Sequence, residues 1–121
     1  MESILTSIKK MLGIAEDYTH FDTDLMIHIN SVLSILAQLG VGSSNYFLIE
    51  NKYATWGDFI PEGFNLELVK SYVYLKVKLL FDPPTSSAVI ESTNRLLSEL
   101  EWRINVEVET SMNAEEGNQN G

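Results

Sequence analysis

Two histidines and an aspartate form the pattern nearest to a metal site in this chain. His20, Asp24 and His28 are spaced four residues apart, so one continuous helix would align two imidazoles with a carboxylate, all of them ligands that zinc accepts. However, His20 precedes the residue expected to cap the helix, and Asp24 suits the dipole at a helix start without any metal. Since these are the only two histidines, we expect no metal site, no cofactor and no His-based catalysis.

Other common catalytic patterns are also missing. The chain has no cysteine, which excludes disulfides and thiolate metal sites. It has no Gly-x-Ser-x-Gly motif, and Gly40-Val41-Gly42 is expected to end a helix instead of opening one around a phosphate. Glu99 and Glu101 are neighbours on an expected helix, so their carboxylates point apart. We therefore expect that the protein is not an enzyme.

The net charge of −9 at pH 7 disfavours nucleic acid as a ligand, because such binding depends on Lys and Arg at phosphates. Residues 1–106 carry 13 acidic and eight basic side chains, and nothing after Arg103 is basic. An acidic chain could instead imitate DNA and block a nucleic-acid-binding enzyme. A mimic of that kind needs carboxylates in a regular double row, whereas these are scattered at helix ends and in the tail.

The apolar periodicity predicts an all-α fold, a four-helix bundle. The helices are expected near residues 2–12, 24–39, 65–81 and 87–106. Asp22 or Thr23 is expected to cap the second helix, and Asn65 the third. Gly40 and Asp82-Pro83-Pro84 are expected to end those two helices. The third helix is apolar on two opposite faces, so it must be either the central helix or an interface helix.

A segment of about 24 residues, 40–63, has no helical period and is rich in aromatic side chains. A loop of this length inside a compact domain is uncommon and is usually functional. Residues 46–49 and 53–56 are the candidates for one short β-hairpin. Trp56 either anchors the loop on the helices, which we favour, or contributes to an interface.

From Leu25 to Ile49 the chain runs 25 residues without an Asp, Glu, Lys or Arg. A helix exposed to solvent normally carries charge on its outer face. The outer side of the second helix instead has small or uncharged residues: Ile27, Asn30, Ser31, Ser34, Ala37 and Gln38. We therefore expect subunit assembly, with Ile27, Ser31 and Ser34, together with Tyr46 and Phe47, against a neighbouring subunit.

The last helix has one apolar stripe and one aromatic residue outside it. The stripe consists of Val89, Ile90, Thr93, Leu96, Leu97, Leu100 and Ile104. Trp102 falls on the opposite side, beside Arg95, and both residue types are enriched at binding hot spots. We expect this side of the helix to contact a partner protein; the alternative is a frayed last turn in which Trp102 folds back.

The sequence divides into a helical domain, residues 1–106, and an acidic flexible tail, residues 107–121, which is poor in apolar residues. No segment approaches the apolar length of a membrane span, and the first residues lack the pattern of a signal peptide. These features favour a soluble protein of the cytoplasm, without a membrane partner.

Three segments are similar to one protein family. They are Thr55-Trp56-Gly57-Asp58-Phe59, the helix stop Phe81-Asp82-Pro83-Pro84, and Glu99-Leu100-Glu101-Trp102-Arg103. In this order, between the expected helices, they resemble the head–tail connector (adaptor, head-completion) proteins of long-tailed phages and prophages. The resemblance covers about residues 3–106, and none of its motifs is catalytic.

The resemblance implies a mainly helical protein that assembles as a ring of about a dozen copies beneath the portal of the DNA-filled capsid. Its partners would be the portal protein and the next tail or head-completion protein, and DNA would be only cargo passing through the channel. The location implied is the head–tail junction of the virion, and the bacterial host cytoplasm before assembly. An acidic channel wall would let DNA slide.

Three other functions remain open from the residues. One is the acidic DNA mimic, and another is a small hydrolase or metal enzyme that relies on His20 and His28. The last is a dimeric helical interaction module or regulator, which shares the interface arguments and differs only in stoichiometry.

Overall fold

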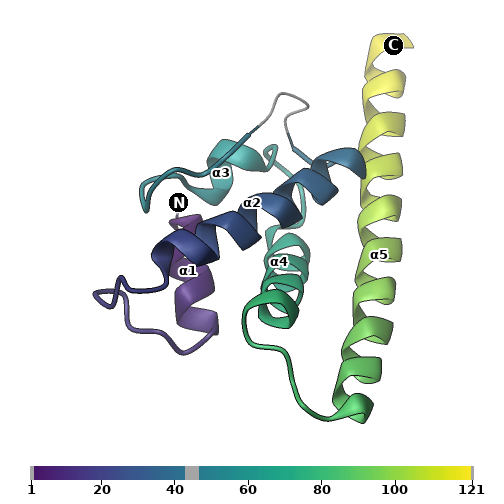
Figure 1. Ribbon diagram of the computed structural model, residues 1–121. Helices are drawn as coiled ribbons and strands as arrows, with labels where there is room; N and C mark the ends of the chain where they lie inside the picture. The colour runs from purple at the N-terminus through teal and green to yellow at the C-terminus, as the bar shows by residue number, and fades with distance from the viewer. Residues whose placement is uncertain (1, 43–46, 121) are drawn as a thin grey trace.

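A computed structural model describes the backbone of residues 2–42 and 47–120 and the side chains of residues 2–42 and 47–112. The described residues contain five helices, shown in Figure 1: α1 (Ile4–Met11), α2 (Asp22–Gln38), α3 (Trp56–Phe59), α4 (Leu66–Phe81) and α5 (Ser87–Asn120). Strands do not occur in this part of the chain, where the β-structure is one isolated antiparallel bridge between Ser3 and Thr55. The predicted all-α fold is confirmed. The predicted number of four helices is wrong, because the short helix α3 was not expected.

Several helix ends follow the local sequence. The Asn65 side chain accepts a hydrogen bond from the amide of Leu68, which confirms it as the cap of α4. Gly40 follows α2 with φ of +98°, a conformation that glycine adopts without strain. The start of α2 differs from the prediction, because its first turn already includes Asp22 and its N-cap is Phe21, which makes no side-chain capping bond.

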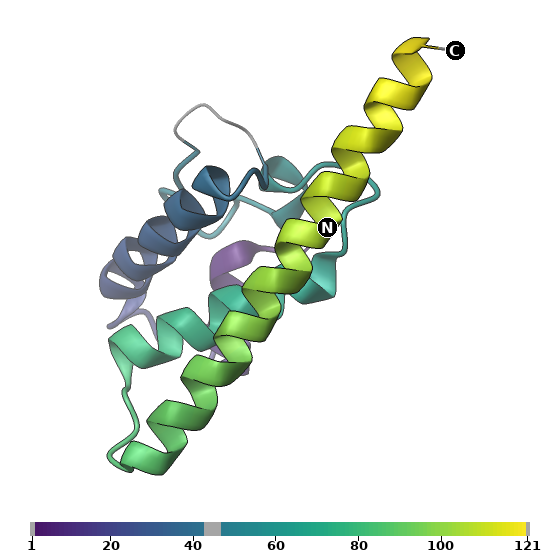
Figure 2. The ribbon, with the colours of Figure 1, turned by 90° about the vertical axis from the view of Figure 1, so that its right-hand side faces the viewer.

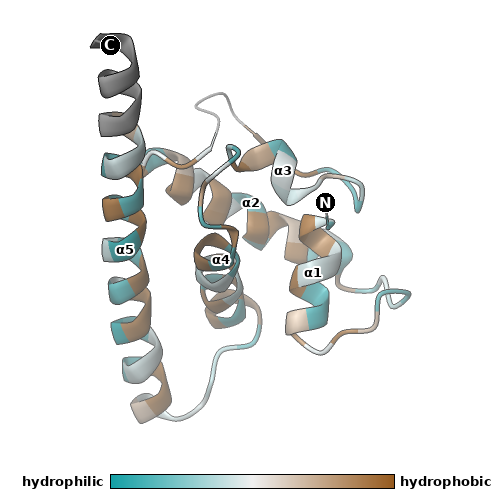
Figure 3. Ribbon diagram, turned by 180° about the vertical axis from the view of Figure 1, so that it is seen from behind, coloured by the Kyte–Doolittle hydropathy of each residue, from teal (hydrophilic) through white to brown (hydrophobic). Residues whose placement is uncertain are grey.

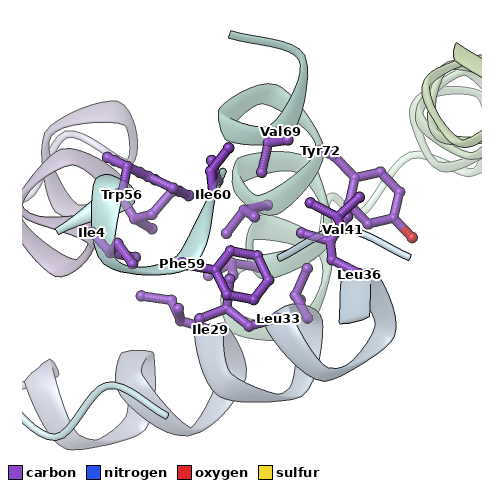
Figure 4. Close-up of a cluster of buried hydrophobic side chains, with 14 of the residues drawn as sticks. Ile4, Ile29, Leu33, Leu36, Val41, Trp56, Phe59, Ile60, Val69 and Tyr72 are labelled. Carbon is purple, nitrogen blue, oxygen red and sulfur yellow. The ribbon is translucent and has the colours of Figure 1, made fainter. Parts of the chain in front are cut away.

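Helix α4 is the central element. It packs against α2, α5 and α1, and Val69, Val73 and Val77 on its inner side are fully buried. Figure 4 shows side chains from α2, from α3 and from the 40–42 turn meeting those of α4 in one cluster. Of the two predicted roles for this helix, the structure supports the central one.

The segment before α4 does not form the predicted hairpin within its described part, residues 47–56. Residues 47–50 have no secondary structure, and residues 56–59 form the short helix α3. The carboxylate of Asp58 accepts a hydrogen bond from the amide of Thr55 at 2.9 Å, which stabilises this helical turn. The amide of Ile4 donates to the carbonyl oxygen of Ala54, so α1 holds the segment from the other side.

Helix α5 is longer than predicted. The sequence indicated an end near residue 106, whereas the helix continues to Asn120 and extends past the other helices in Figures 1 and 2. Val108 is partly buried and lies over Gly40 at the end of α2. This contact continues the core beyond residue 106, and the flexible tail from residue 107 remains a prediction. A division into two domains remains a prediction.

The apolar stripe of α5 is narrower than the sequence indicated. Leu97, Leu100 and Ile104 are buried, but Val89 and Leu96 are 49% and 44% exposed. Figure 3 shows hydrophobic and hydrophilic residues alternating along α5, as in a helix with one buried side. The first two turns of α5 therefore pack on the domain less closely than its middle.

Candidate interaction surface

From Leu25 onward the outer side of α2 is exposed and uncharged. Ile27 is 59% exposed, Ile35 is 37% exposed, and Ser31 and Ser34 are also exposed. The positions that the sequence placed outward are therefore outward in the structure, and their contact with another subunit stays a prediction. The two serines are small, so another backbone can approach them closely, and none of these four side chains carries a charge that must be desolvated.

A groove lies between α2 and the segment that follows residue 46. It has a volume of about 300 Å³ and is lined by Leu33, Ser34, Ala37, Gln38, Phe47, Leu48 and Phe59. The Phe47 and Phe59 rings are 5.3 Å apart between centroids, which gives the groove an aromatic wall. The structure thus brings Ser34 and Phe47 to one site, as expected, whereas Tyr46 lies outside the described residues.

Asn30 positions the far wall of this groove. Its amide nitrogen donates to the carbonyl oxygen of Ile49 at 3.0 Å, and its carbonyl oxygen accepts from the amide of Ile49 at 2.8 Å. These two hydrogen bonds satisfy the backbone N–H and C=O of Ile49, as a neighbouring strand would do in a sheet. The helical period placed Asn30 on the outer side of α2 with no role, because its partner is 19 residues away in the chain.

Trp56 anchors the segment before α4 on α1 and does not belong to the candidate interface. Its side chain is fully buried, and the indole Nε1–H donates to Ser7 Oγ at 2.7 Å. The anchor role favoured from the sequence is therefore correct. Its inclusion among the interface residues is wrong, because the ring is enclosed within one chain and leaves no surface for a partner.

A second exposed surface lies on α5, around Trp102. Trp102 is 67% exposed, and Arg95, seven residues earlier and so on the same side of the helix, is exposed as well. The guanidinium of Arg95 reaches only Ser92 Oγ, at 3.3 Å, whereas that of Arg103 is paired with Glu99 at 2.7 Å. Arg95 therefore keeps most of its hydrogen-bonding capacity for another group.

The most polar pocket is occupied by the chain's own ion pair. This pocket, about 450 Å³ in volume, includes Lys9, Glu16, Asp17 and Asp22. Lys9 is 2% exposed; its ammonium is 2.8 Å from an Asp22 carboxylate oxygen and donates to the carbonyl oxygens of Glu16 and Tyr18. The ammonium thus makes two hydrogen bonds to backbone carbonyls and one ion pair, and these contacts hold the 14–21 linker in place. The sequence pattern gave no sign of this contact, because a lysine near a helix end is ordinarily exposed.

The histidine pattern does not become a site. His20 is exposed in the linker before α2, with its ring 4.9 Å from that of Phe21, and His28 is half-buried on α2. Over residues 2–42 and 47–112, no three His, Asp or Glu side chains gather closely enough to hold a metal ion. None of the helices in the described part of the chain combines the length and apolarity of a membrane span.

Comparison with known families gives one match, which covers most of the chain. The family described as "Phage connector protein" matches residues 4–111. This range includes both exposed surfaces and the part of α5 that packs on α4. Searches of curated proteins and of solved structures find no match.

Proposed function

The chain belongs to the phage connector protein family, a family of structural proteins, and we propose that it acts as a ring adaptor between the portal and the tail or the next head-completion protein. In this proposal about a dozen copies assemble beneath the portal at the head–tail junction of the virion, after synthesis in the bacterial host cytoplasm. DNA passes through the ring as cargo, and the protein performs no catalysis.

The observation that carries the proposal, beyond the family, is the uncharged exposed face of α2 with its groove. A chain with net charge −9 that leaves one helix face without charge has a surface suited to contact with protein. Because the groove and the Trp102 surface belong to different elements, one copy can contact two neighbours at once. A ring requires this arrangement.

The test compares oligomeric states with and without the portal protein. We expect native mass spectrometry or sedimentation to show a ring of this chain on the portal, whether or not the isolated chain is monomeric. A complex with only two copies would support the dimeric module instead. No association with portal, tail or head-completion proteins would contradict the adaptor function.

A charge placed on α2 separates assembly from folding. Ser34→Glu should weaken assembly on the portal by several kcal/mol, because an unpaired carboxylate would be buried at the interface. The thermal stability of the monomer should change little, since Ser34 is exposed in one chain. Ser87→Glu, at the exposed start of α5, is the matched control and should assemble normally. Equal assembly of both variants would show that the α2 face is not an interface.

The absence of catalysis also has a direct test. Replacing both His20 and His28 by Ala should leave assembly intact, and elemental analysis of the purified protein should find no stoichiometric metal. Tightly bound zinc would contradict this part of the proposal.

A further inference from the structure

We propose that Trp102 on α5 of one copy inserts into the groove between α2 and residues 47–48 of the next copy, so that neighbouring subunits meet head to tail. This inference rests on the proposed function, and it adds which two surfaces of the chain meet. The occupant of the groove is thus a second copy of this chain, not the portal.

The groove is shaped to receive one aromatic side chain. Its volume of about 300 Å³ is at the small end of the range for ligand sites, and the half-buried Phe47, which packs on the buried ring of Phe59, provides an aromatic side chain that an indole can contact. Leu48, which is 58% exposed, also lines the groove. An indole seated there would cover apolar surface that one chain leaves in water.

Trp102 cannot fill the groove of its own chain. Leu97, Leu100 and Ile104 are the buried side of α5, the helix that packs against α4. Trp102 lies on the opposite side of the same helix, where it is 67% exposed and points away from the domain. Figure 2 shows α5 along the edge of the molecule, which leaves this side open to another chain.

Charge favours a second copy as the occupant. Two chains of net charge −9 repel each other, and the described lining of the groove contains no charged side chain that would add to this repulsion. Leu48 lines the groove, and Glu50, two residues further along the chain, is exposed. Arg95 lies about 10 Å from Trp102 along α5. With Trp102 in the groove, Arg95 can reach the rim and meet Glu50 of the other chain.

The two surfaces are different, and that decides the symmetry of the contact. An isologous dimer pairs a patch with itself, whereas a contact between two different patches is heterologous and closes into a ring when the rotation allows it. The contact between the groove of one copy and Trp102 of the next joins two different patches and is therefore heterologous. Repeated from copy to copy, such a contact can close into the ring that the adaptor function needs.

Cross-linking tests the pairing directly, because the chain contains no cysteine. Ser34→Cys places a thiol in the groove, and Ser98→Cys places one a single turn from Trp102 on the same exposed side of α5. The double variant, assembled with the portal and treated with a short bis-maleimide, should give a ladder of covalent oligomers of this chain. Each single variant should remain monomeric on the same gel.

Ser34→Cys with Ser111→Cys is the matched control, because Ser111 is also exposed on α5 but lies on the side of the helix opposite Trp102. It should give little ladder. A ladder from this control alone, or no ladder from Ser34/Ser98 although a ring forms on the portal, would overturn the pairing and leave the adaptor function standing. Dimers of the Ser34→Cys single variant, or its linkage to the portal, would overturn it too. If no assembly forms at all, both the pairing and the adaptor function fail.

Charge exchange gives an independent readout. Arg95→Glu and Glu50→Arg should each weaken assembly, and the double variant should recover most of the loss. Trp102→Ala should weaken self-association about thirtyfold or more, as expected for a hot spot, with Trp102→Phe in between. An unchanged melting temperature of the isolated chain would locate the loss in the contact. No recovery by the charge exchange would show that Arg95 and Glu50 do not meet.

Discussion

At the scale of single residues, Trp56 links segments that are far apart in the chain. It is the largest fully buried side chain of the described residues and lies near Ile4 in Figure 4. Its hydrogen bond joins the segment before α4 to Ser7 of α1. We expect Trp56→Ala to lower the free energy of unfolding by about 3–5 kcal/mol, the usual effect of removing a buried aromatic ring. Urea denaturation measures this difference.

The matched variants separate the ring of Trp56 from its hydrogen bond. Ser7→Ala removes the acceptor and should cost about 1–2 kcal/mol, because the indole N–H is then buried without a partner. Tyr53→Ala is the exposed control, since its side chain is 75% exposed, and should change stability by less than about 0.5 kcal/mol. Equal effects at Trp56 and Tyr53 would contradict the anchor role.

Tyr72 makes the stability of the fold sensitive to alkaline pH. Burial, then the hydrogen bond to Glu101 at 2.8 Å and the negative charge of Glu101, raise the pKa of the Tyr72 phenol well above its ordinary value. An unfolded tyrosine ionises near pH 10, while folded Tyr72 keeps its proton. Its contribution to stability is therefore complete below about pH 10 and falls as the pH rises from there toward the folded pKa.

We expect Tyr72→Phe to be less stable than the parent at pH 8, by about 1 kcal/mol, and to lose less stability between pH 8 and pH 11. Urea midpoints at several pH values measure both effects. Tyr53→Phe, which alters an exposed phenol, is the control and should follow the parent. Parallel pH profiles for the parent and Tyr72→Phe would show that this phenol does not couple α4 to α5.

At the scale of elements, the length of α5 depends on one close approach. A Cβ added to Gly40 would lie 2.9 Å from Val108 Cγ1, so the turn after α2 and the distal part of α5 touch only because residue 40 has no side chain. The sequence pattern marked Gly40 as the end of α2. Its second role, the close contact with Val108 of α5, arises only when the two helices meet.

This contact predicts that Gly40→Ala is more destabilising than Gly13→Ala. Both glycines have positive φ, but a Cβ at Gly13 meets nothing within 4 Å. Gly13→Ala should cost about 1 kcal/mol for the backbone conformation alone, and Gly40→Ala about 1–2 kcal/mol more for the collision. Adding Val108→Ala to Gly40→Ala should relieve part of that excess. Equal costs in thermal denaturation would mean that α5 does not rest on Gly40.

At the scale of the whole molecule, the net charge opposes the assembly that the surfaces favour. Copies of net charge −9 repel one another, and the screening length falls from about 10 Å at 0.1 M salt to about 3 Å at 1 M. We expect self-association on the portal to strengthen as salt rises from 0.05 to 0.5 M. Analytical ultracentrifugation at fixed protein concentration measures this trend, and Arg95→Ala is the control that removes the local attraction.

The opposite trend would have a distinct meaning. Weaker assembly at high salt, abolished in Arg95→Ala, would show that the local pair with Glu50 outweighs the overall repulsion. Weaker assembly that persists in Arg95→Ala would contradict an interface built from uncharged faces, because charges elsewhere would then hold the subunits together.

The family, the all-α class and the positions of most helices could be inferred from the order of the residues alone. These features depend on apolar spacing and on caps such as Asn65 and Gly40, which act within a few residues of where they stand. The outward direction of Ile27 and Trp102 followed from the same periodicity. Such properties are local, so the sequence is sufficient for them.

Tertiary contacts decided the remaining features. The segment near Ile49 is held by Asn30, Trp56 is buried because α1 supplies Ser7, and α5 continues because Val108 finds Gly40. Each of these depends on residues that meet across 19 or more positions of the chain. The helix propensity and the apolar period of either segment do not indicate these contacts. The free energy of burial and hydrogen bonding is gained only when both segments are in place.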